Sequence, residues 1–304
     1  MNSIPARQNE EPQLRLLRAR KRILDNASTW LIIQFGLTVV MPLGLTILGL
    51  ALPQIRPWAA AAALGVTLCD VLLLDRMQRH RIRLSAKIAE AFDEAVLEVP
   101  WNKLVGGKRA PYPEIAAAER KWKQSGGTDK PLRDWYPVAA GRPPLHLGRI
   151  ICQRTNLWYD GELRRHYGRW LIGLGLGLPS ILLVIAGFAG LTIDSFVTTV
   201  LAPAAPILTW SAREYYRQKD AADAQETLRG EAEALWEAAR TGKCSEDECR
   251  VQARELQNAI YLRRAGTGLI FPGLYRHRRK AMETAMNDAA EGYVAELNLK
   301  AEAE

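Results

Sequence analysis

Four long apolar runs restrict the fold of this chain more than any other feature. They cover roughly residues 28–50, 57–74, 170–192 and 193–211. A helix needs about 20 apolar residues to cross a bilayer, and the first and third runs reach that length without a charged side chain. The second and fourth runs are just long enough. Helices of a soluble core are the alternative, but charge-free runs of this length favour four transmembrane helices.

The composition agrees with a protein that is partly embedded in a membrane and partly soluble. Hydrophobic residues make up 48% of the 304 residues, yet the mean hydropathy is only −0.14. The formal net charge is +8, and its basic excess lies in residues 1–28 and 76–169. These two segments would attract a polyanion, whether a lipid headgroup, a nucleotide or a nucleic acid.

The links between the apolar runs indicate how the chain is threaded. Residues 51–56 join the first pair and residues 191–195 the second, and both links are nearly free of Lys and Arg. Because Lys and Arg stay on the cytoplasmic side, both termini and the central segment are predicted to be cytoplasmic. Tryptophan rings favour the headgroup level, and four of them fall at the ends of the runs. They are Trp30, Trp58, Trp170 and Trp210.

The sequence therefore predicts a mainly α membrane protein. Two transmembrane helical hairpins should carry long cytoplasmic helical extensions and a loop-rich central cytoplasmic segment. The expected parts are an N-terminal arm at 1–27, a first hairpin at 28–75, a central domain at 76–169, a second hairpin at 170–211 and a C-terminal helical region at 212–304.

Periodicity and capping signals predict helices outside the membrane. After the second run, apolar residues recur at every fourth position and form one helical stripe, which Pro100 should end. The stripe consists of Leu84, Ile88, Phe92 and Val96. Ser245 and Glu248 form a capping-box pattern for a helix that runs to about Arg264. The remaining expectations are a short helix at about 113–124, a break at 266–275 and a last helix at 276–302.

Seven blocks of the sequence, taken in order, resemble one known family. They are "NSIPARQNE" (2–10), "AFDEAVLEVPWNKL" (91–104), "PLRDWYP" (131–137), "PLHLGRIICQRTNLWYD" (144–160), "REYYRQKDAAD" (213–223), "RELQNAIYLRRA" (254–265) and "MNDAAEGYV" (286–294). Nearly the whole chain thus resembles the SMODS-associated four-transmembrane effector family of bacterial CBASS anti-phage systems. The resemblance implies an inner-membrane effector that responds to a cyclic di- or oligonucleotide made by a functionally linked nucleotidyltransferase. Its activation would permeabilise the membrane.

Candidate ligand residues follow from the chemistry of a cyclic oligonucleotide. Its phosphates need Arg, Lys, amide or hydroxyl donors, and its bases need aromatic or guanidinium planes. The central segment offers both kinds of group. The candidate ligand-binding residues are Arg133, Trp135, Tyr136, His146, Arg149, Gln153, Arg154, Asn156 and Trp158. On a helix, Arg149, Gln153 and Asn156 share one face, which His146 extends.

Simpler interpretations stay open for the same region. A basic, aromatic helix just before a membrane span is commonly an interfacial element, and Arg164, Arg165 and Arg169 suit that role. Trp135 and Tyr136 could instead be core side chains. The ligand and the interfacial interpretation therefore compete over the stretch that leads into the third span.

Two polar residues lie inside the apolar runs. Asp70 sits about four residues inside the cytoplasmic end of the second run, where a carboxylate is costly unless it faces protein or water. Either a pore or helix-pairing role or simple hydration near the surface would explain it. Gln34 in the first run is a candidate for a hydrogen bond between helices. Four spans cannot enclose a wide aqueous pore, so a pore would require a homo-oligomer.

Enzyme chemistry is not expected. The histidines form no HExxH pattern, the cysteines show no paired spacing, and no GxSxG motif is present. Neither a metal nor another cofactor is therefore predicted. The basic cluster at 274–280 suits a membrane surface or a second subunit better than DNA or RNA. The leading hypothesis is a cyclic-oligonucleotide-gated, membrane-disrupting or pore-forming effector. A non-conducting receptor or scaffold that recruits a partner is the alternative.

Overall fold

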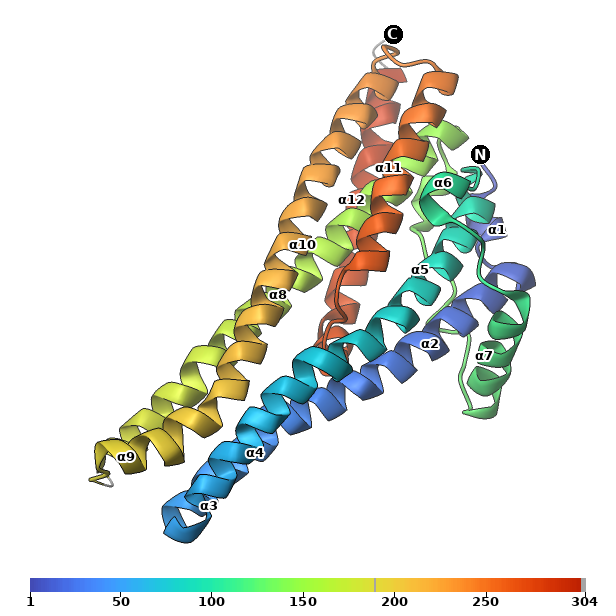
Figure 1. The fold of residues 1–304 in the computed structure, drawn as a ribbon. Coiled ribbons are helices and arrows are strands. Elements are labelled where there is room, and N and C mark those ends of the chain that lie inside the picture. Colours follow the sequence, from blue (N-terminus) through green and yellow to red (C-terminus); the bar gives the residue numbers. More distant parts are fainter. Residues whose placement is uncertain (189, 302–304) are drawn as a thin grey trace.

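The computed structural model describes residues 1–188 and 190–301, and within them the secondary structure is helical, without a β-strand. Four long helical rods dominate the molecule (Figure 1). They cover Glu11–Ala51, Pro53–Leu97, Leu145–Phe188 and Ile193–Arg240, and each is long and apolar enough to cross a membrane. The prediction of a mainly α membrane protein with four spans is therefore confirmed.

The rods pair into two hairpins. Hairpin one comprises α2 (Glu11–Phe35), η1 (Gly36–Val40), α3 (Met41–Ala51), η2 (Pro53–Ile55), α4 (Arg56–Cys69), η3 (Asp70–Leu74) and α5 (Asp75–Leu97). Hairpin two comprises α8 (Leu145–Phe188), α9 (Ile193–Phe196), η5 (Val197–Leu201) and α10 (Ala202–Arg240). Both turns fall where the sequence predicts the links, because Pro53 and the Thr192 cap begin new helices there.

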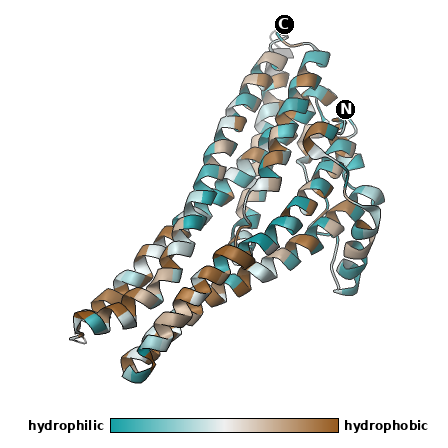
Figure 2. Cartoon of the chain, in the orientation of Figure 1, coloured by the Kyte–Doolittle hydropathy of each residue, from teal (hydrophilic) through white to brown (hydrophobic). Residues whose placement is uncertain are grey.

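The other elements gather at the end of the molecule that holds both termini. They are α1 (Ile4–Arg7), α6 (Lys103–Gly106), α7 (Tyr112–Gln124), η4 (Val138–Gly141), α11 (Glu246–Gly266) and α12 (Pro272–Ala301). Figure 2 shows hydrophobic residues concentrated at the opposite end, around α3 and α9. The two ends are called the polar end and the apolar end below. Large side chains such as Leu68 and Leu176 are exposed at the apolar end, as a lipid-facing surface requires.

The two hairpins are joined at both ends. Helix α10 packs along α8 and also contacts α3 and α4 of hairpin one. At the tip of the apolar end, Arg56 donates a hydrogen bond of 2.9 Å to the Ser195 hydroxyl. At the polar end, α11 packs on α5 and α12 packs on α8 (Figure 1). The C-terminal helices therefore connect the two hairpins away from the apolar end.

Local sequence signals located most helices outside the apolar runs. The Ser245 side chain accepts from the Glu248 amide, and the Glu248 side chain accepts from the Ser245 amide, so the predicted capping box is present. Along α5, Ile88, Phe92 and Val96 of the predicted stripe are buried. Helix α5 ends at Leu97, three residues before the proline that was expected to stop it.

Two predicted boundaries differ from the structure. Helix α12 begins at Pro272 rather than near residue 276, because proline fits the first position of a helix. The central segment contains fewer loops than expected. Helix α8 begins at Leu145 and continues without a break into the third span, so the irregular part is confined to about residues 98–144.

The N-terminal arm is packed into the molecule. The Asn2 amide donates to the carbonyls of Ala140 at 2.8 Å and Pro143 at 2.9 Å. Gln8 is fully buried and exchanges two hydrogen bonds with the backbone of Tyr136, at 2.7 and 3.2 Å. These contacts hold the irregular segment that contains Trp135 and Tyr136 against the start of hairpin one.

Candidate functional site

A cavity of about 480 Å³ lies between the two hairpins at the polar end. Its walls are formed by α2 and α5 of hairpin one, by α8 and α10 of hairpin two, and by residues 130–136. The lining is completed by Ile260 and Arg264 of α11, by the α11–α12 loop and by the first turns of α12. Because its walls come from both hairpins, the size of this cavity depends on how the hairpins are placed relative to each other.

A partly buried cation of the cavity wall, Arg20, lacks an acidic partner among the described residues. The Arg20 guanidinium lies 4.9 Å from the centre of the Trp135 ring, and none of the ion pairs formed by the described residues includes it. Burial and the positive charge of Arg264 lower the pKa of Arg20 to about 10, which still leaves it charged at neutral pH. Arg264 itself is paired with Asp93 at 2.5 Å. The cavity therefore presents a positive charge that the surrounding protein does not neutralise.

Three buried polar atoms of the cavity wall have no hydrogen-bond partner among the described residues. They are Arg20 Nε, Asn156 Nδ2 and Gln225 Oε1. An unpaired buried polar atom costs free energy, so most such atoms in folded proteins are satisfied by protein, water or a ligand. Two donors and one acceptor around the same cavity suit a polar guest.

Aromatic side chains line the same space. Trp135, Tyr136, Tyr159 and Tyr275 all contribute to the wall. Tyr136 is also a core residue, because its ring stacks on Phe92 and its hydroxyl donates to Asp93 at 2.6 Å. Trp135 is half-buried and carries Arg20 on its face, so a flat ring and a cation are presented together.

The structure brings four of the nine candidate ligand residues to the cavity. Arg133, Trp135, Tyr136 and Asn156 line it, whereas His146, Arg149, Gln153, Arg154 and Trp158 are not among its lining residues. Sequence reasoning missed Arg20, Gln225 and Arg264, which come from three other helices. The basic excess of the N-terminal arm was the one sequence signal that pointed toward Arg20.

The five remaining candidates have contacts of their own. Arg149 is buried and donates to the Leu97 carbonyl at 2.7 Å, which caps the end of α5. Gln153 is fully buried and donates to the Ala253 carbonyl and the Gln257 side chain. The other contacts are His146 with Glu246 at 2.8 Å, Arg154 with Glu233 at 2.9 Å, and the Trp158 ring with Tyr159.

The polar residues predicted to share one face of α8 therefore do not all face the cavity. Arg149, Gln153 and Asn156 do share one side of the helix, as their spacing predicts. However, seven residues extend about 10 Å along a helix axis. Arg149 and Gln153 meet α5 and α11, and only Asn156 reaches the level of the cavity.

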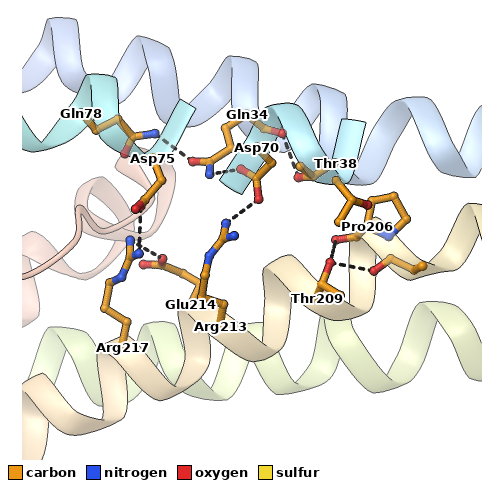
Figure 3. A network of polar contacts seen from close by, with 12 residues as sticks. Gln34, Thr38, Asp70, Asp75, Gln78, Pro206, Thr209, Arg213, Glu214 and Arg217 are labelled. Carbon is orange, nitrogen blue, oxygen red and sulfur yellow. Dashed lines mark hydrogen bonds and ion pairs between the residues drawn. The ribbon is translucent and has the colours of Figure 1, made fainter. Parts of the chain in front are cut away.

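A second polar group is centred on Gln34 and Asp70, which lie inside the first two apolar runs (Figure 3). The Gln34 amide donates to one oxygen of Asp70, and Arg213 of α10 donates to the other at 2.5 Å. Gln78 donates to the Gln34 side chain at 2.8 Å. Asp70 is 2% exposed, so this carboxylate is inside the protein and bridges hairpin one to hairpin two. Arg213 was not recognised in the sequence, because it lies just beyond the fourth run.

A chain of polar contacts on α10 extends from Arg213 toward the cavity. Arg217 donates to Asp75 of hairpin one at 2.8 Å and to Glu214 at 3.2 Å (Figure 3). Glu214 accepts from Gln218 at 2.6 Å. Gln218 in turn accepts from Arg164, a residue of the cavity wall, at 2.6 Å.

Comparisons with known proteins place this architecture in one family. The sequence profile of the SMODS-associating 4TM effector domain matches residues 2–293. The chain is also similar to a protein of Bacillus cereus (strain VD146) described as a probable CBASS effector molecule. The two are 19% identical over 272 residues, which cover 88% of this chain and 89% of the relative. No solved structure matches the chain.

Proposed function

We propose a function for this chain from one premise, namely that it belongs to the SMODS-associating 4TM effector family. The chain acts as a multi-pass effector of a CBASS anti-phage system in the bacterial inner membrane, with both termini in the cytoplasm. A functionally linked nucleotidyltransferase makes a cyclic di- or oligonucleotide, which binds in the cavity between the hairpins. Binding then opens or disrupts the membrane part of a homo-oligomer.

The observation that carries this proposal is the unpaired Arg20 on the face of Trp135 inside a cavity. Guanidinium groups bind phosphate oxygens through strong, charge-assisted hydrogen bonds. A neighbouring aromatic plane accepts a nucleobase by stacking, which stabilises binding by about 1–3 kcal/mol per base. The unsatisfied amides of Asn156 and Gln225 can then read base edges.

The size and position of the cavity support the same proposal. Pockets for small molecules usually measure about 300–1,000 Å³, and the cavity of about 480 Å³ falls in that range. Its walls come from both hairpins, so a ligand that contacts both walls favours one spacing of the hairpins over another. A ligand shifts a conformational equilibrium only through such differential contacts.

The proposal includes three further expectations. The effector performs no catalysis and needs no cofactor, because its action is a change of membrane permeability. It binds neither DNA nor RNA directly, since Arg20 lies inside a cavity of small-molecule size. The lipid bilayer and other copies of the same chain are its physical partners.

Binding of synthetic cyclic nucleotides to the purified protein tests the ligand part. A panel of cyclic di- and trinucleotides, with linear dinucleotides as a reference, is titrated calorimetrically into wild type and Arg20→Gln. We expect one cyclic nucleotide to bind, and Arg20→Gln to weaken it at least about tenfold, the effect of losing one hydrogen bond to a charged group. Arg22→Gln is the matched control, because Arg22 lies on the same helix but outside the cavity lining.

Two results would contradict the ligand part. One is the absence of binding by every cyclic nucleotide of the panel. The other is equal affinity for wild type and Arg20→Gln.

Dye release from liposomes that contain the purified protein tests the membrane part. Nucleotide binding without dye release would instead identify a non-conducting receptor that recruits a partner, which is the alternative function.

A further inference from the structure

The loop between α11 and α12 reaches into the space between the two hairpins. Figure 1 shows that α11 runs from the polar end toward the middle of the long rods and that the chain reverses there in a loop. Helix α12 then runs back toward the polar end. Three consecutive apolar residues occupy the turn, namely Leu269, Ile270 and Phe271. These three residues are called the plug below.

The plug contacts both hairpins at the depth of the tryptophans that mark the span ends. The Phe271 ring lies 5.4 Å from that of Phe35 in hairpin one and 5.8 Å from that of Trp170 in hairpin two, between ring centres. Leu269 and Ile270 belong to the same apolar cluster, whose fully buried members include Tyr167 and Trp210. The plug is therefore part of the contact that holds the hairpins together at this level.

Polar contacts clamp the backbone of this loop from the side of hairpin two. Arg164 donates to the Thr267 hydroxyl at 2.9 Å and to the Gly268 carbonyl at 3.1 Å. Gln218 donates to the Leu269 carbonyl at 3.2 Å. Gly268 permits this close approach, because a Cβ there would lie 2.9 Å from the Arg217 side chain. The clamp and the polar chain toward Asp75 thus share Arg164 and Gln218.

The same loop also forms a wall of the cavity. Thr267, Gly268, Leu269 and Ile270 line it, and so does Arg164. An anion bound in the cavity can therefore compete with Thr267 and Gly268 for the Arg164 guanidinium. Thr267 and Gly268 offer neutral oxygens to the guanidinium, whereas an anion brings a full negative charge, so the Coulomb attraction favours the anion over the loop.

We propose that Leu269, Ile270 and Phe271 form an autoinhibitory plug between the hairpins, which is released when an anionic ligand in the cavity draws Arg164 away from the loop. This inference rests on the proposed function, since it assumes that the hairpins move to open the membrane part. Arg164 is a positioning residue in this scheme, because it acts through the loop that it holds.

Dye release without any nucleotide tests the plug directly. In liposomes, Phe271→Ala is expected to release dye at least tenfold faster than wild type in the absence of nucleotide, because the ring contacts of Phe271 with Phe35 and with Trp170 are lost. Phe188→Ala is the matched control, since Phe188 is a highly exposed phenylalanine at the apolar end of α8, the helix that carries Trp170. A Phe271→Ala protein that stays as tight as Phe188→Ala would overturn the plug.

A crosslinked variant keeps the test decisive if Phe271→Ala is poorly folded. Phe35→Cys and Phe271→Cys are combined on a Cys69→Ser background, because the other native cysteines are buried. A short bifunctional thiol reagent then joins positions 35 and 271. We expect the uncrosslinked protein to leak without nucleotide, and crosslinking to reduce the leak to the wild-type rate. An unchanged leak after complete crosslinking would refute the plug.

Calorimetry on the same samples separates failure of the plug from failure of the proposed function. If the crosslinked protein binds a cyclic nucleotide and the nucleotide still causes dye release, the ligand site stands and the plug is refuted. If wild type binds no nucleotide of the panel, the proposed function fails, whereas a leak of Phe271→Ala alone would still support the plug.

Discussion

Two polar clusters lie side by side at the polar end, and they differ in how well their hydrogen bonds are satisfied. The first, here the α5–α11 cluster, joins Glu90, Asp93, Tyr136, Arg254, Gln257 and Arg264. Asp93 accepts from Tyr136, Gln257 and Arg264, while Glu90 accepts from Arg254 and Gln257, at distances of 2.5–2.9 Å. The second, here the cavity cluster, consists of Arg20, Asn156 and Gln225, each with an unpaired atom.

The difference distinguishes a polar group that supports the fold from one that is available to a ligand. Buried polar networks stabilise a fold when their members are paired with one another. In the α5–α11 cluster every charged side chain has a partner of opposite charge, and Arg254 Nε is the one buried side-chain atom of the cluster without a hydrogen bond among the described residues. Burial and the charge of Asp93 raise the pKa of Glu90, although Gln257 and Arg254 oppose that shift. In the cavity cluster, the unpaired atoms have no such neighbouring groups to compensate for their burial. Uncompensated polar groups are common at sites where function requires them at the expense of stability.

The largest expected effect is loss of the Asp93 carboxylate. Asp93→Ala leaves Arg264 buried without its counter-charge and removes the acceptors of Tyr136 and Gln257. Breaking a buried ion pair from one side costs about 3–5 kcal/mol of unfolding free energy, which thermal unfolding in detergent would measure. Glu233→Ala, which removes a half-exposed partner of Arg154, should cost about 0–1 kcal/mol. Equal losses in both variants would contradict the contrast between interior and surface.

The next effect concerns a candidate ligand residue that lies outside the cavity. Arg149→Ala removes the donor to the Leu97 carbonyl at the end of α5, which should cost about 1–3 kcal/mol of stability. Its affinity for a cyclic nucleotide should equal that of wild type, as should that of Arg154→Ala. Calorimetry and thermal unfolding on the same preparations check both statements. Selective loss of nucleotide binding by Arg149→Ala would move the ligand site away from the cavity.

Arg20 should show the opposite pattern. Arg20→Met removes a buried charge that the protein does not compensate, so the ligand-free protein should become more stable by about 1 kcal/mol. Its nucleotide affinity should fall together with that of Arg20→Gln. Thermal unfolding with and without nucleotide measures both changes. A destabilised Arg20→Met would mean that Arg20 belongs to the structural cluster after all.

The smallest expected effect is the pH dependence of Asp160, a neighbour of the cavity cluster. Burial alone would raise its pKa, but the charge of Arg164 and hydrogen bonds from Arg164 and Gln225 outweigh burial and lower the pKa. A carboxyl with a lowered pKa stabilises the fold above its ordinary pKa of about 3.9, and this contribution disappears as the pH falls through the lowered value. Wild type should therefore lose more stability than Asp160→Asn when the pH is lowered below about 4, as measured by thermal unfolding. Parallel pH profiles would argue against a folded-state pKa shift.

Local signals in the sequence were sufficient for most of the fold. The charge-free apolar runs, the capping box at Ser245 and the stripe through Phe92 predicted helices that the structure contains. Such signals are reliable because hydrogen bonds within a helix and burial of one face depend on residues close in sequence. The boundaries near Leu145 and Pro272 were less accurate, because a proline that can begin a helix and a helix that is stabilised by packing on other segments are not visible in local hydrophobicity.

The candidate site was predictable only as a class of chemistry. The sequence pointed to Arg, aromatic and amide groups, and its candidates Trp135 and Asn156 do line the cavity. It did not indicate that Arg149 and Gln153 form hydrogen bonds with α5 and α11 instead of facing the cavity. Nor did it indicate that Arg20 has no Asp or Glu as an ion-pair partner among the described residues. The partners of these polar side chains lie far away in the sequence, 52 residues for Arg149 and Leu97 and 104 residues for Gln153 and Gln257.

By itself, the amino-acid sequence determined four membrane-crossing helices, their pairing into hairpins and the family of the chain, because these follow from local hydrophobicity and ordered sequence blocks. Only the tertiary structure decided which cations remain unpaired, that Asp70 pairs with Arg213, and that Phe271 contacts both Phe35 and Trp170. The physical reason is that burial and charge compensation are properties of neighbours in space, and here those neighbours come from opposite ends of the chain.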